Sequence, residues 1–392
     1  GYRSSAAYLP RVPVIKSPTG QELIAAEDLP KAFDWRDVDG TSYVTDSWNQ
    51  HIPQYCGACW IHGTLSTLND RLKVARKAQW PDVRFGRQGI INCVPNPENP
   101  NKPPPGCDGG DAYMIHEYLH KNPMPDDTCL PYQAKNMACE KANVCRNCLP
   151  NGTCWAVENY PTFGVSEYGN VTGELAMMKE IYARGPIACS FAAPDTFMMK
   201  YAEISMQNDG VFVTHQHFTD KDVDHVMEVA GWGETKSGMK YWVIRNSWGT
   251  YWGEMGWLKL QRGVDAMKSE SAGCDWAIPT WDGMQEVLDG KKVGQYVEGD
   301  IPVHASLRAQ MAQASVEAGS GGAAAAQAAK DKGPARKASA EAQAVTPAAP
   351  TARGGDLGDL HDFGVFAAGV LVALGVVRVT GRGGVRQPEL LG

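Results

Sequence analysis

The chain has 392 residues and a formal net charge of −7, and 43% of its residues are hydrophobic. At about 150 residues per domain this length allows more than one domain. The net negative charge argues against a nucleic-acid partner, and we expect that it serves only to keep the protein soluble.

The N-terminal segment, residues 1–29, has little hydrophobic periodicity and contains Pro10, Pro13 and Pro18. We predict an extended, propeptide-like arm. The chain begins with Gly1 and carries no apolar signal segment. We therefore expect either that a signal peptide has been removed or that N-terminal residues are missing.

A globular domain is predicted over residues 30–282. Apolar residues recur at helical spacing over 59–77, which predicts a helix with Cys59 at or near its N-terminus. The five prolines of 96–106 predict a loop. A second helix is predicted over 174–185, where a glycine and then a proline end it.

Strands are predicted in the later part of this domain. Short apolar runs alternate with glycine and polar turns from 187 to 260, and the clearest runs are 241–244 and 257–260. A helical half is therefore expected to precede a strand-rich half.

The sequence changes character after about residue 283. Residues 283–358 are rich in Ala and Gly and have few large apolar residues, so we predict a disordered linker. A candidate membrane anchor follows at 359–380, and a short basic tail at 381–392.

The case for the anchor rests on the apolar run 363–377. Its 15 residues would span ~22 Å as a helix, which is less than the ~30 Å hydrocarbon core of a bilayer. Acidic residues precede the run and arginines follow it, as in an outside-to-inside anchor. A peripheral segment or a merely translated tail is the alternative.

Eleven cysteines lie between residues 56 and 274. This odd number suggests five disulfides and one free thiol, and hence a protein of the secretory pathway. Two glycosylation sequons, at Asn151 and Asn170, agree with that interpretation.

The strongest local signal is the run Gln54-Tyr55-Cys56-Gly57-Ala58-Cys59-Trp60. A Cys-Gly-Ala-Cys-Trp run is typical of the nucleophile segment of one class of cysteine protease. A thioredoxin-like redox pair is the alternative, but that class has its Trp before the first Cys.

Three more segments follow in order, namely Gly106-Cys107-Asp108-Gly109-Gly110, Asp224-His225-Val226 and Arg245-Asn246-Ser247-Trp248-Gly249. Together with the Cys59 run they resemble the papain family of cysteine proteases over roughly residues 30–280. The spacings from Cys59 to His225 and Asn246, 225 − 59 = 166 and 246 − 59 = 187, exceed the usual ~130–150. We attribute the excess to the loops at 96–106 and 129–154.

The resemblance implies a role for each of these residues. Cys59 would be a thiolate nucleophile, favoured by a helix N-terminus and a neighbouring imidazolium. His225 would act as general base and then general acid. Asn246 would orient the imidazole, and Trp248 would shield their hydrogen bond. Gly109 and Gly110 would line the substrate.

A glutamine side chain is expected to stabilise the oxyanion together with the backbone N–H of Cys59. Gln50 and Gln54 are both candidates. Gln50 stands nine positions before Cys59 (59 − 50 = 9), three more than is usual in the family. The three extra residues, 51–53, resemble the insertion of the cathepsin X group of carboxypeptidases. By that resemblance Gln50 is the oxyanion residue and His51 faces the terminal carboxylate of a substrate.

Ten cysteines are assigned to disulfides. The resemblance implies the pairs Cys56–Cys107 and Cys93–Cys129, and Cys189 with Cys274 completes the set. Two local disulfides are expected among the remaining four cysteines, with a metal site as the alternative. These are Cys139, Cys145, Cys148 and Cys154.

The resemblance thus implies an α+β, papain-like fold with a helical domain, a β-barrel-like domain and a cleft between them. We expect a monomeric, cofactor-free cysteine carboxypeptidase that acts on peptide or protein C-termini in a lysosome-like or extracellular setting. A papain-type endopeptidase or dipeptidase and a non-catalytic surface binding protein are the alternatives.

Overall fold

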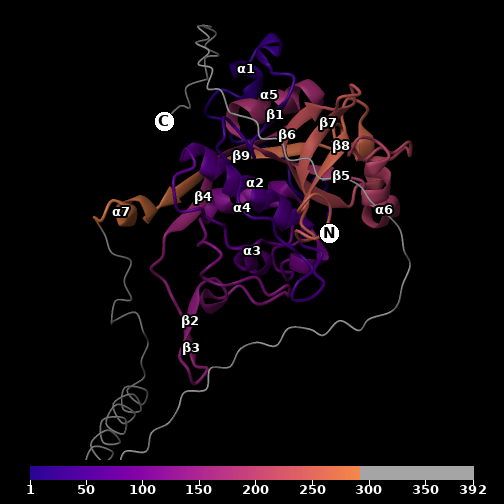
Figure 1. The fold of residues 1–392 in the computed structure, drawn as a ribbon. Coiled ribbons are helices and arrows are strands. Elements are labelled where there is room, and N and C mark those ends of the chain that lie inside the picture. The colour runs from indigo at the N-terminus through magenta and orange to yellow at the C-terminus, as the bar shows by residue number, and fades with distance from the viewer. Residues whose placement is uncertain (292–392) are drawn as a thin grey trace, which may run out of the picture. The chain divides into compact units, whose positions relative to one another are not determined.

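A computed structural model describes residues 1–291 (Figure 1). The helices are α1 (Gly20–Leu23), α2 (Cys59–Ala75), α3 (Arg87–Cys93), α4 (Ala112–Lys121), α5 (Glu174–Arg184), α6 (Asp195–Met206) and α7 (Met284–Leu288). The strands are β1 (Phe33–Asp34), β2 (Arg146–Cys148), β3 (Cys154–Ala156), β4 (Thr162–Val171), β5 (Ile187–Phe191), β6 (His225–Glu234), β7 (Lys240–Arg245), β8 (Trp257–Gln261) and β9 (Cys274–Asp282).

One seven-stranded sheet has the order β4-β9-β5-β6-β7-β8, with β1 also paired to β6. All of its pairs are antiparallel. β6 is buried from His225 to Gly233, as expected for a strand covered on both faces. The strands predicted at 241–244 and 257–260 lie in β7 and β8.

The helix α2 is buried at every position except Lys73 and Ala75. It ends two residues before the predicted end at residue 77, because Lys77 and Ala78 take φ values of 53° and 55°, which a right-handed helix cannot continue through. The helix predicted at 174–185 is observed as α5 and ends before Gly185, whose φ is 115°.

Two hydrophobic cores are present. One contains apolar residues of α2, α3 and α4 together with some from β4, β5, β6 and β9, and the other lies mainly in the strand-rich half. The two halves meet where α2 contacts β6. A Cβ on Gly63 of α2 would lie 2.9 Å from the carbonyl oxygen of Val226, so glycine allows this close approach.

The predicted arm, residues 1–29, lies along the globular part. Three carboxylates of the globular part accept hydrogen bonds from backbone N–H groups of the arm. Asp111 accepts from Ser5 (2.6 Å), Glu167 from Lys16 (2.8 Å) and Glu180 from Gly20 (3.1 Å). Arg11 of the arm also forms an ion pair with Asp111 at 2.7 Å. Much of the segment is extended, but residues 20–23 form the short helix α1, and the segment is anchored at several points.

The predicted linker does not begin at residue 283. Residues 284–288 form α7, and Met284 is buried in the core around α2 because its apolar side chain gains from leaving water. The rest of the linker, the candidate anchor at 359–380 with its apolar run 363–377, and the tail at 381–392 lie outside the described residues. Within residues 1–291, no helix is both long enough and apolar enough to cross a bilayer.

Candidate active site

Cys59 is the first residue of α2, and its side chain is 1% exposed. Among the described residues it is the one cysteine outside a disulfide. The N-terminal end of a helix favours a thiolate. The Cys56–Cys107 disulfide, together with a 2.9 Å hydrogen bond from the Gly57 N–H to the Cys107 carbonyl, fixes the turn that presents Cys59.

His225 and Asn246 meet at the adjacent ends of β6 and β7. The Nε2 of His225 lies 2.9 Å from the Oδ1 of Asn246. That oxygen also accepts the backbone N–H of Ser247 at 2.8 Å, so it is the amide oxygen and Nε2 must be the donor. A neutral His225 therefore has Nδ1 as its proton acceptor. The Trp248 ring covers this pair, with its centroid 5.0 Å from that of His225.

The two glutamine candidates differ in their surroundings. Gln50 is 3% exposed; its Nε2 donates to the Cys56 carbonyl at 3.0 Å and its Oε1 accepts from Ser247 Oγ at 2.7 Å. Gln54 is exposed and its amide donates to the Ala134 carbonyl instead. Gln50 thus lies between the Cys59 turn and the Asn246 segment, as an oxyanion donor requires.

The first residues of the arm lie over Cys59. The Gly110 N–H donates to the Gly1 carbonyl at 3.1 Å, and the Tyr2 N–H donates to the Asp224 carbonyl at 2.9 Å. A Cβ on Gly1 would lie only 2.4 Å from the Cys59 sulfur. The arm therefore covers the candidate nucleophile from both sides of the site.

Gly110 pairs with the arm through its main chain, since its carbonyl also accepts the Arg3 N–H at 2.9 Å. A Cβ on Gly110 would lie 2.8 Å from the Trp60 ring, so this position needs glycine. Its neighbour Gly109 has φ 110°, which also favours glycine. Both glycines thus provide an open backbone edge to an extended peptide.

Burial shifts the pKa values of both members of the candidate pair. Burial raises the pKa of the Cys59 thiol, and burial lowers the pKa of His225 to about 4. Around neutral pH, with the arm in place, both groups are therefore uncharged. A reactive thiolate–imidazolium pair requires that the arm leave and water enter.

Comparison with known proteins agrees with this geometry. Residues 29–275 match the model of the papain family of cysteine proteases. The chain belongs to that family. It is accordingly a cysteine protease, and its substrates are peptides.

Two curated relatives illustrate the similarity. Cathepsin Z of Onchocerca volvulus is 40% identical over 235 residues, which cover 60% of this chain and 71% of the relative. Cathepsin C of Schistosoma mansoni is 29% identical over 263 residues, which cover 66% of this chain and 54% of that protein.

The predicted α+β fold is confirmed. A chain from a structural study of the mite allergens Blo t 1 and Der p 1 superposes with a TM-score of 0.50 and 22% identity, covering 69% of this chain and 75% of that one. At this identity the match shows the fold alone.

The inserted loop of this papain-family protease lies next to the site. His51 stacks on Tyr55 with ring centroids 5.0 Å apart, and faces Trp248 at 6.4 Å. Since Trp248 stacks on His225, the rings of Tyr55, His51, Trp248 and His225 form a row. The His51 N–H donates to Asn49 Oδ1 at 2.9 Å, and Asn49 pairs with Trp248, which holds the loop in place.

The disulfides differ from expectation at two points. Cys93 bonds to Cys139, and Cys129 bonds to Cys145, so the predicted Cys93–Cys129 pair is wrong. The reason is local: Asn92 accepts the Met137 N–H at 3.1 Å, which brings the segment before Cys139 to the end of α3.

The other disulfides are Cys56–Cys107, Cys148–Cys154 and Cys189–Cys274. Cys139 and Cys145 thus pair outside the local segment, contrary to the expected two local bridges. Cys139, Cys145, Cys148 and Cys154 are all oxidised, which leaves no thiolate among them for the alternative metal site. Five disulfides are typical of a protein of the secretory pathway.

Several other residues with polar side chains lie outside the candidate site. Asn151 and Asn170 are both exposed, and their glycosylation stays a prediction. His62 is buried, with Nδ1 2.9 Å from the Ala58 carbonyl, and so belongs to the packing of α2. His215 and His217 are exposed.

Proposed function

We propose that this protease removes residues from the C-termini of peptides. The observation that carries the proposal is the place of His51, on an inserted loop next to the Trp248 and His225 rings. The insertion resembles that of the cathepsin X group, also called cathepsin Z, and the 40% identity to a cathepsin Z supports the same conclusion.

The proposed reaction is acyl transfer through Cys59. The Cys59 thiolate attacks the carbonyl carbon, and the Gln50 side chain and the Cys59 N–H stabilise the oxyanion. His225 then gives its proton to the leaving amine, which forms a thioester. Next, His225 takes a proton from water, whose oxygen attacks the thioester and releases the acid and the thiolate. Asn246 keeps the imidazole in the required tautomer throughout.

His51 explains why a terminal bond would be chosen. A protonated imidazole gives a free carboxylate a charge-assisted hydrogen bond worth ~1.5–3 kcal/mol, which an amidated or internal residue cannot accept. Within the described residues, no carboxylate forms an ion pair with His51. The His51 loop also limits how far a substrate extends past the cleaved bond.

We expect His51→Ala to lower kcat/KM on a peptide with a free C-terminus by about 10- to 150-fold, because the variant cannot form the charge-assisted hydrogen bond to the terminal carboxylate. Turnover of the same peptide with an amidated C-terminus should change by less than about threefold. The chain is folded whole and then cut at a site-specific protease sequence placed in the exposed segment 25–28; we call the product the arm-cleaved protein. Mass spectrometry of the products measures both rates.

Replacing the exposed His215 with Ala is the matched control and should change neither rate. Equal losses on both peptides in His51→Ala would contradict the proposal, as would internal cuts in both peptides by the unmodified sequence. Burial lowers the pKa of His51 below its ordinary 6.5. Because the imidazolium exists below that pKa, the preference for a free C-terminus should be strongest in acid and disappear as pH rises. An acidic, lysosome-like or acidic extracellular compartment suits this chemistry.

A further inference from the structure

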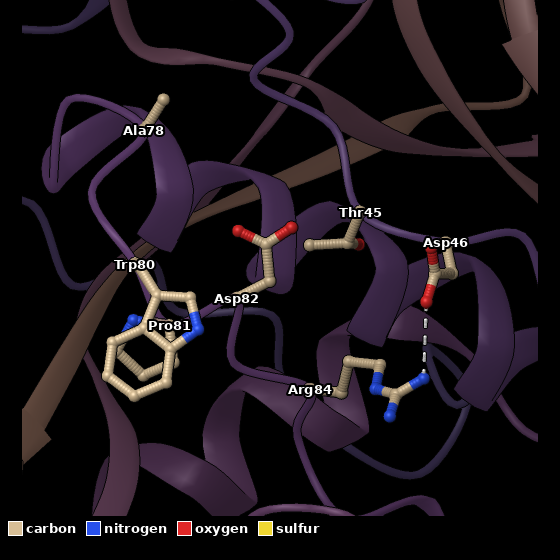
Figure 2. Close-up of a pocket in the computed structure, with 7 residues that line it drawn as sticks. All are labelled: Thr45, Asp46, Ala78, Trp80, Pro81, Asp82 and Arg84. Atoms are coloured by element: carbon tan, nitrogen blue, oxygen red, sulfur yellow. Dashed lines mark hydrogen bonds and ion pairs between the residues drawn. The ribbon is translucent and has the colours of Figure 1, made fainter.

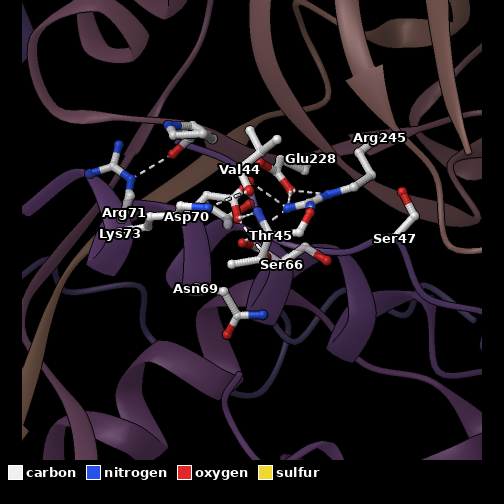
Figure 3. Close-up of polar contacts among 12 residues, drawn as sticks. Val44, Thr45, Ser47, Ser66, Asn69, Asp70, Arg71, Lys73, Glu228 and Arg245 are labelled. Carbon is white, nitrogen blue, oxygen red and sulfur yellow. Dashed lines mark hydrogen bonds and ion pairs between the residues drawn. The ribbon is translucent and has the colours of Figure 1, made fainter. Parts of the chain in front are cut away.

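A buried ionic cluster lies where the nucleophile helix meets the sheet (Figure 3). Its members are Arg245, Asp70 and Glu228, whose residues are at most 2% exposed. The Arg245 guanidinium donates to Asp70 Oδ2 at 2.6 Å and to Glu228 Oε2 at 2.8 Å. It also donates to the Thr45 carbonyl at 2.7 Å. The mechanism proposed above uses none of these groups.

Each member lies on an element that carries a candidate catalytic residue. Asp70 is on α2, eleven positions after Cys59 (70 − 59 = 11). Glu228 is on β6, three positions after His225 (228 − 225 = 3), and stands directly opposite Arg245 in the β6–β7 ladder. Arg245 is the last residue of β7 and immediately precedes Asn246. One guanidinium therefore joins the three elements that bring Cys59, His225 and Asn246 together.

With both carboxylates ionised the cluster would carry a net negative charge, because two carboxylates face one guanidinium. Burial raises the pKa of Glu228 well above its ordinary value, and burial also raises the pKa of Asp70. Two buried acids beside one guanidinium oppose each other's ionisation, so protonation of one of them is favoured. The cluster is then close to neutral, and what Arg245 contributes is the fixed geometry of its donors.

Thr45 closes the cluster on its outer side. Its N–H and hydroxyl donate to Asp70 Oδ1 at 2.8 and 2.7 Å, and the residue is 7% exposed. Thr45 also lines a surface pocket of about 450 Å³, together with Trp80, Asp82 and Arg84 (Figure 2). It therefore separates the cluster from a solvent-filled hollow, which keeps the ionic contacts in a setting of low dielectric.

We propose that Arg245 is a positioning residue that, through Asp70 and Glu228, holds the Cys59 helix at a fixed distance from the strands of His225 and Asn246. The proposal rests on the roles assigned to Cys59 and His225 but not on the carboxypeptidase activity. Nucleophile and base must be held within a fraction of an ångström for proton transfer, and a misplacement of ~1 Å costs about 100-fold in rate.

The test is Arg245→Lys in the arm-cleaved protein. Lysine keeps the charge but cannot bond to Asp70, Glu228 and the Thr45 carbonyl in the same geometry as the guanidinium. The expected result is a fall in kcat of about tenfold or more, with KM within about twofold. The pH midpoint for alkylation of Cys59 by iodoacetamide should also rise, because a displaced His225 stabilises the thiolate less. The alkylation midpoint measures how strongly His225 stabilises the Cys59 thiolate, and it requires no substrate.

Arg71, the residue that follows Asp70 on α2, provides a matched control. Arg71 is equally buried and forms a 2.8 Å ion pair with Glu180, but it joins α2 to α5 and not to β6 or β7. Arg71→Lys should lower Tm by a similar amount and leave the alkylation midpoint unchanged. A purely structural role for Arg245 would give the same midpoint in both variants and would overturn the proposal.

If Arg245→Lys does not fold, Thr45→Val decides the matter. It removes one hydrogen bond to Asp70 and preserves the side-chain shape, so it should shift the alkylation midpoint in the same direction by a smaller amount. No shift in Thr45→Val would then count against the proposal. Failure of the carboxypeptidase proposal would instead appear in the product analysis of His51→Ala, with these midpoints unaffected.

Discussion

Cutting the folded chain between residues 25 and 28 should increase the alkylation rate of Cys59 by on the order of 100-fold. The uncut chain can react only when the arm opens, because Gly1 and Tyr2 lie over a sulfur that is otherwise enclosed. Several hydrogen bonds to carboxylates hold the arm, and ~2.8 kcal/mol of docking free energy keeps the open form near 1%. Since Cys59 is the one free thiol among the described residues, mass spectrometry of the labelled protein measures this rate directly.

The same docking should weaken in acid. Burial tends to raise the pKa of Glu167, but the hydrogen bonds from Lys16 and Ser17 of the arm outweigh it, so the pKa is lowered below its ordinary 4.5. A carboxylate with a lowered pKa stabilises the docked arm above the ordinary pKa, and this stabilisation is lost as pH falls through the lowered value. Labelling of the uncut chain should therefore accelerate below about pH 4.5.

Two variants test whether the hydrogen bonds from the arm to Glu167 hold the arm in place. Glu167→Gln should speed labelling of the uncut chain, because the charged acceptor is gone. Glu22→Gln is the matched control, since that carboxylate lies within the arm and, among residues 1–291, accepts hydrogen bonds only from Thr19. Equal labelling rates in the cut and uncut chains would show that the arm does not protect Cys59.

Asn246→Ala should lower kcat of the arm-cleaved protein by about 100-fold, within the range expected for loss of an oriented acid–base group. Asn246 Oδ1 is the atom that holds the proton of His225 on Nε2 and leaves Nδ1 free for the Cys59 thiol. Without it, the imidazole rotates and populates the other tautomer. Ring-nitrogen NMR shifts of His225 report the tautomer, and steady-state kinetics report the rate.

The control for this variant is Asn92→Ala. Asn92 is as deeply buried, and its amide accepts from Gln88 and Met137 and donates to the Asn143 carbonyl. Asn92→Ala should cost stability without changing the His225 tautomer. If both variants lose the same activity at a temperature where both are folded, Asn246 has no orienting role.

The sequence motifs were sufficient to predict the papain-like fold and to nominate Cys59, His225 and Asn246. Each of these residues stands in a run of neighbours that marks it locally, so its identification requires no long-range information. The choice between Gln50 and Gln54 was harder, because both precede Cys59 at a short distance. The structure separates them by burial and by the contact between Gln50 and Ser247.

Other features had no local signal. Asp70 and Arg245 are 175 positions apart, and nothing in either segment marks them as partners. Several cysteines follow Cys93 in the sequence, and their spacing alone does not determine which of them forms a disulfide with it. The path of the arm over Cys59 depends on backbone contacts with Gly110 and Asp224 that residue types do not specify.

The two separate hydrophobic cores have a consequence for heat tolerance. Cys59 is the first residue of α2, while His225 and Asn246 lie at the ends of β6 and β7, so catalysis depends on the seam where α2 packs on the sheet. Polar contacts at this seam, including the Arg245 cluster and the hydrogen bonds of Arg71 to the Pro186 and Ala277 carbonyls, can loosen before the apolar cores open. On warming, turnover should therefore decline at a lower temperature than the near-ultraviolet circular dichroism of the buried tryptophans, and the working range of the enzyme would be set at this seam.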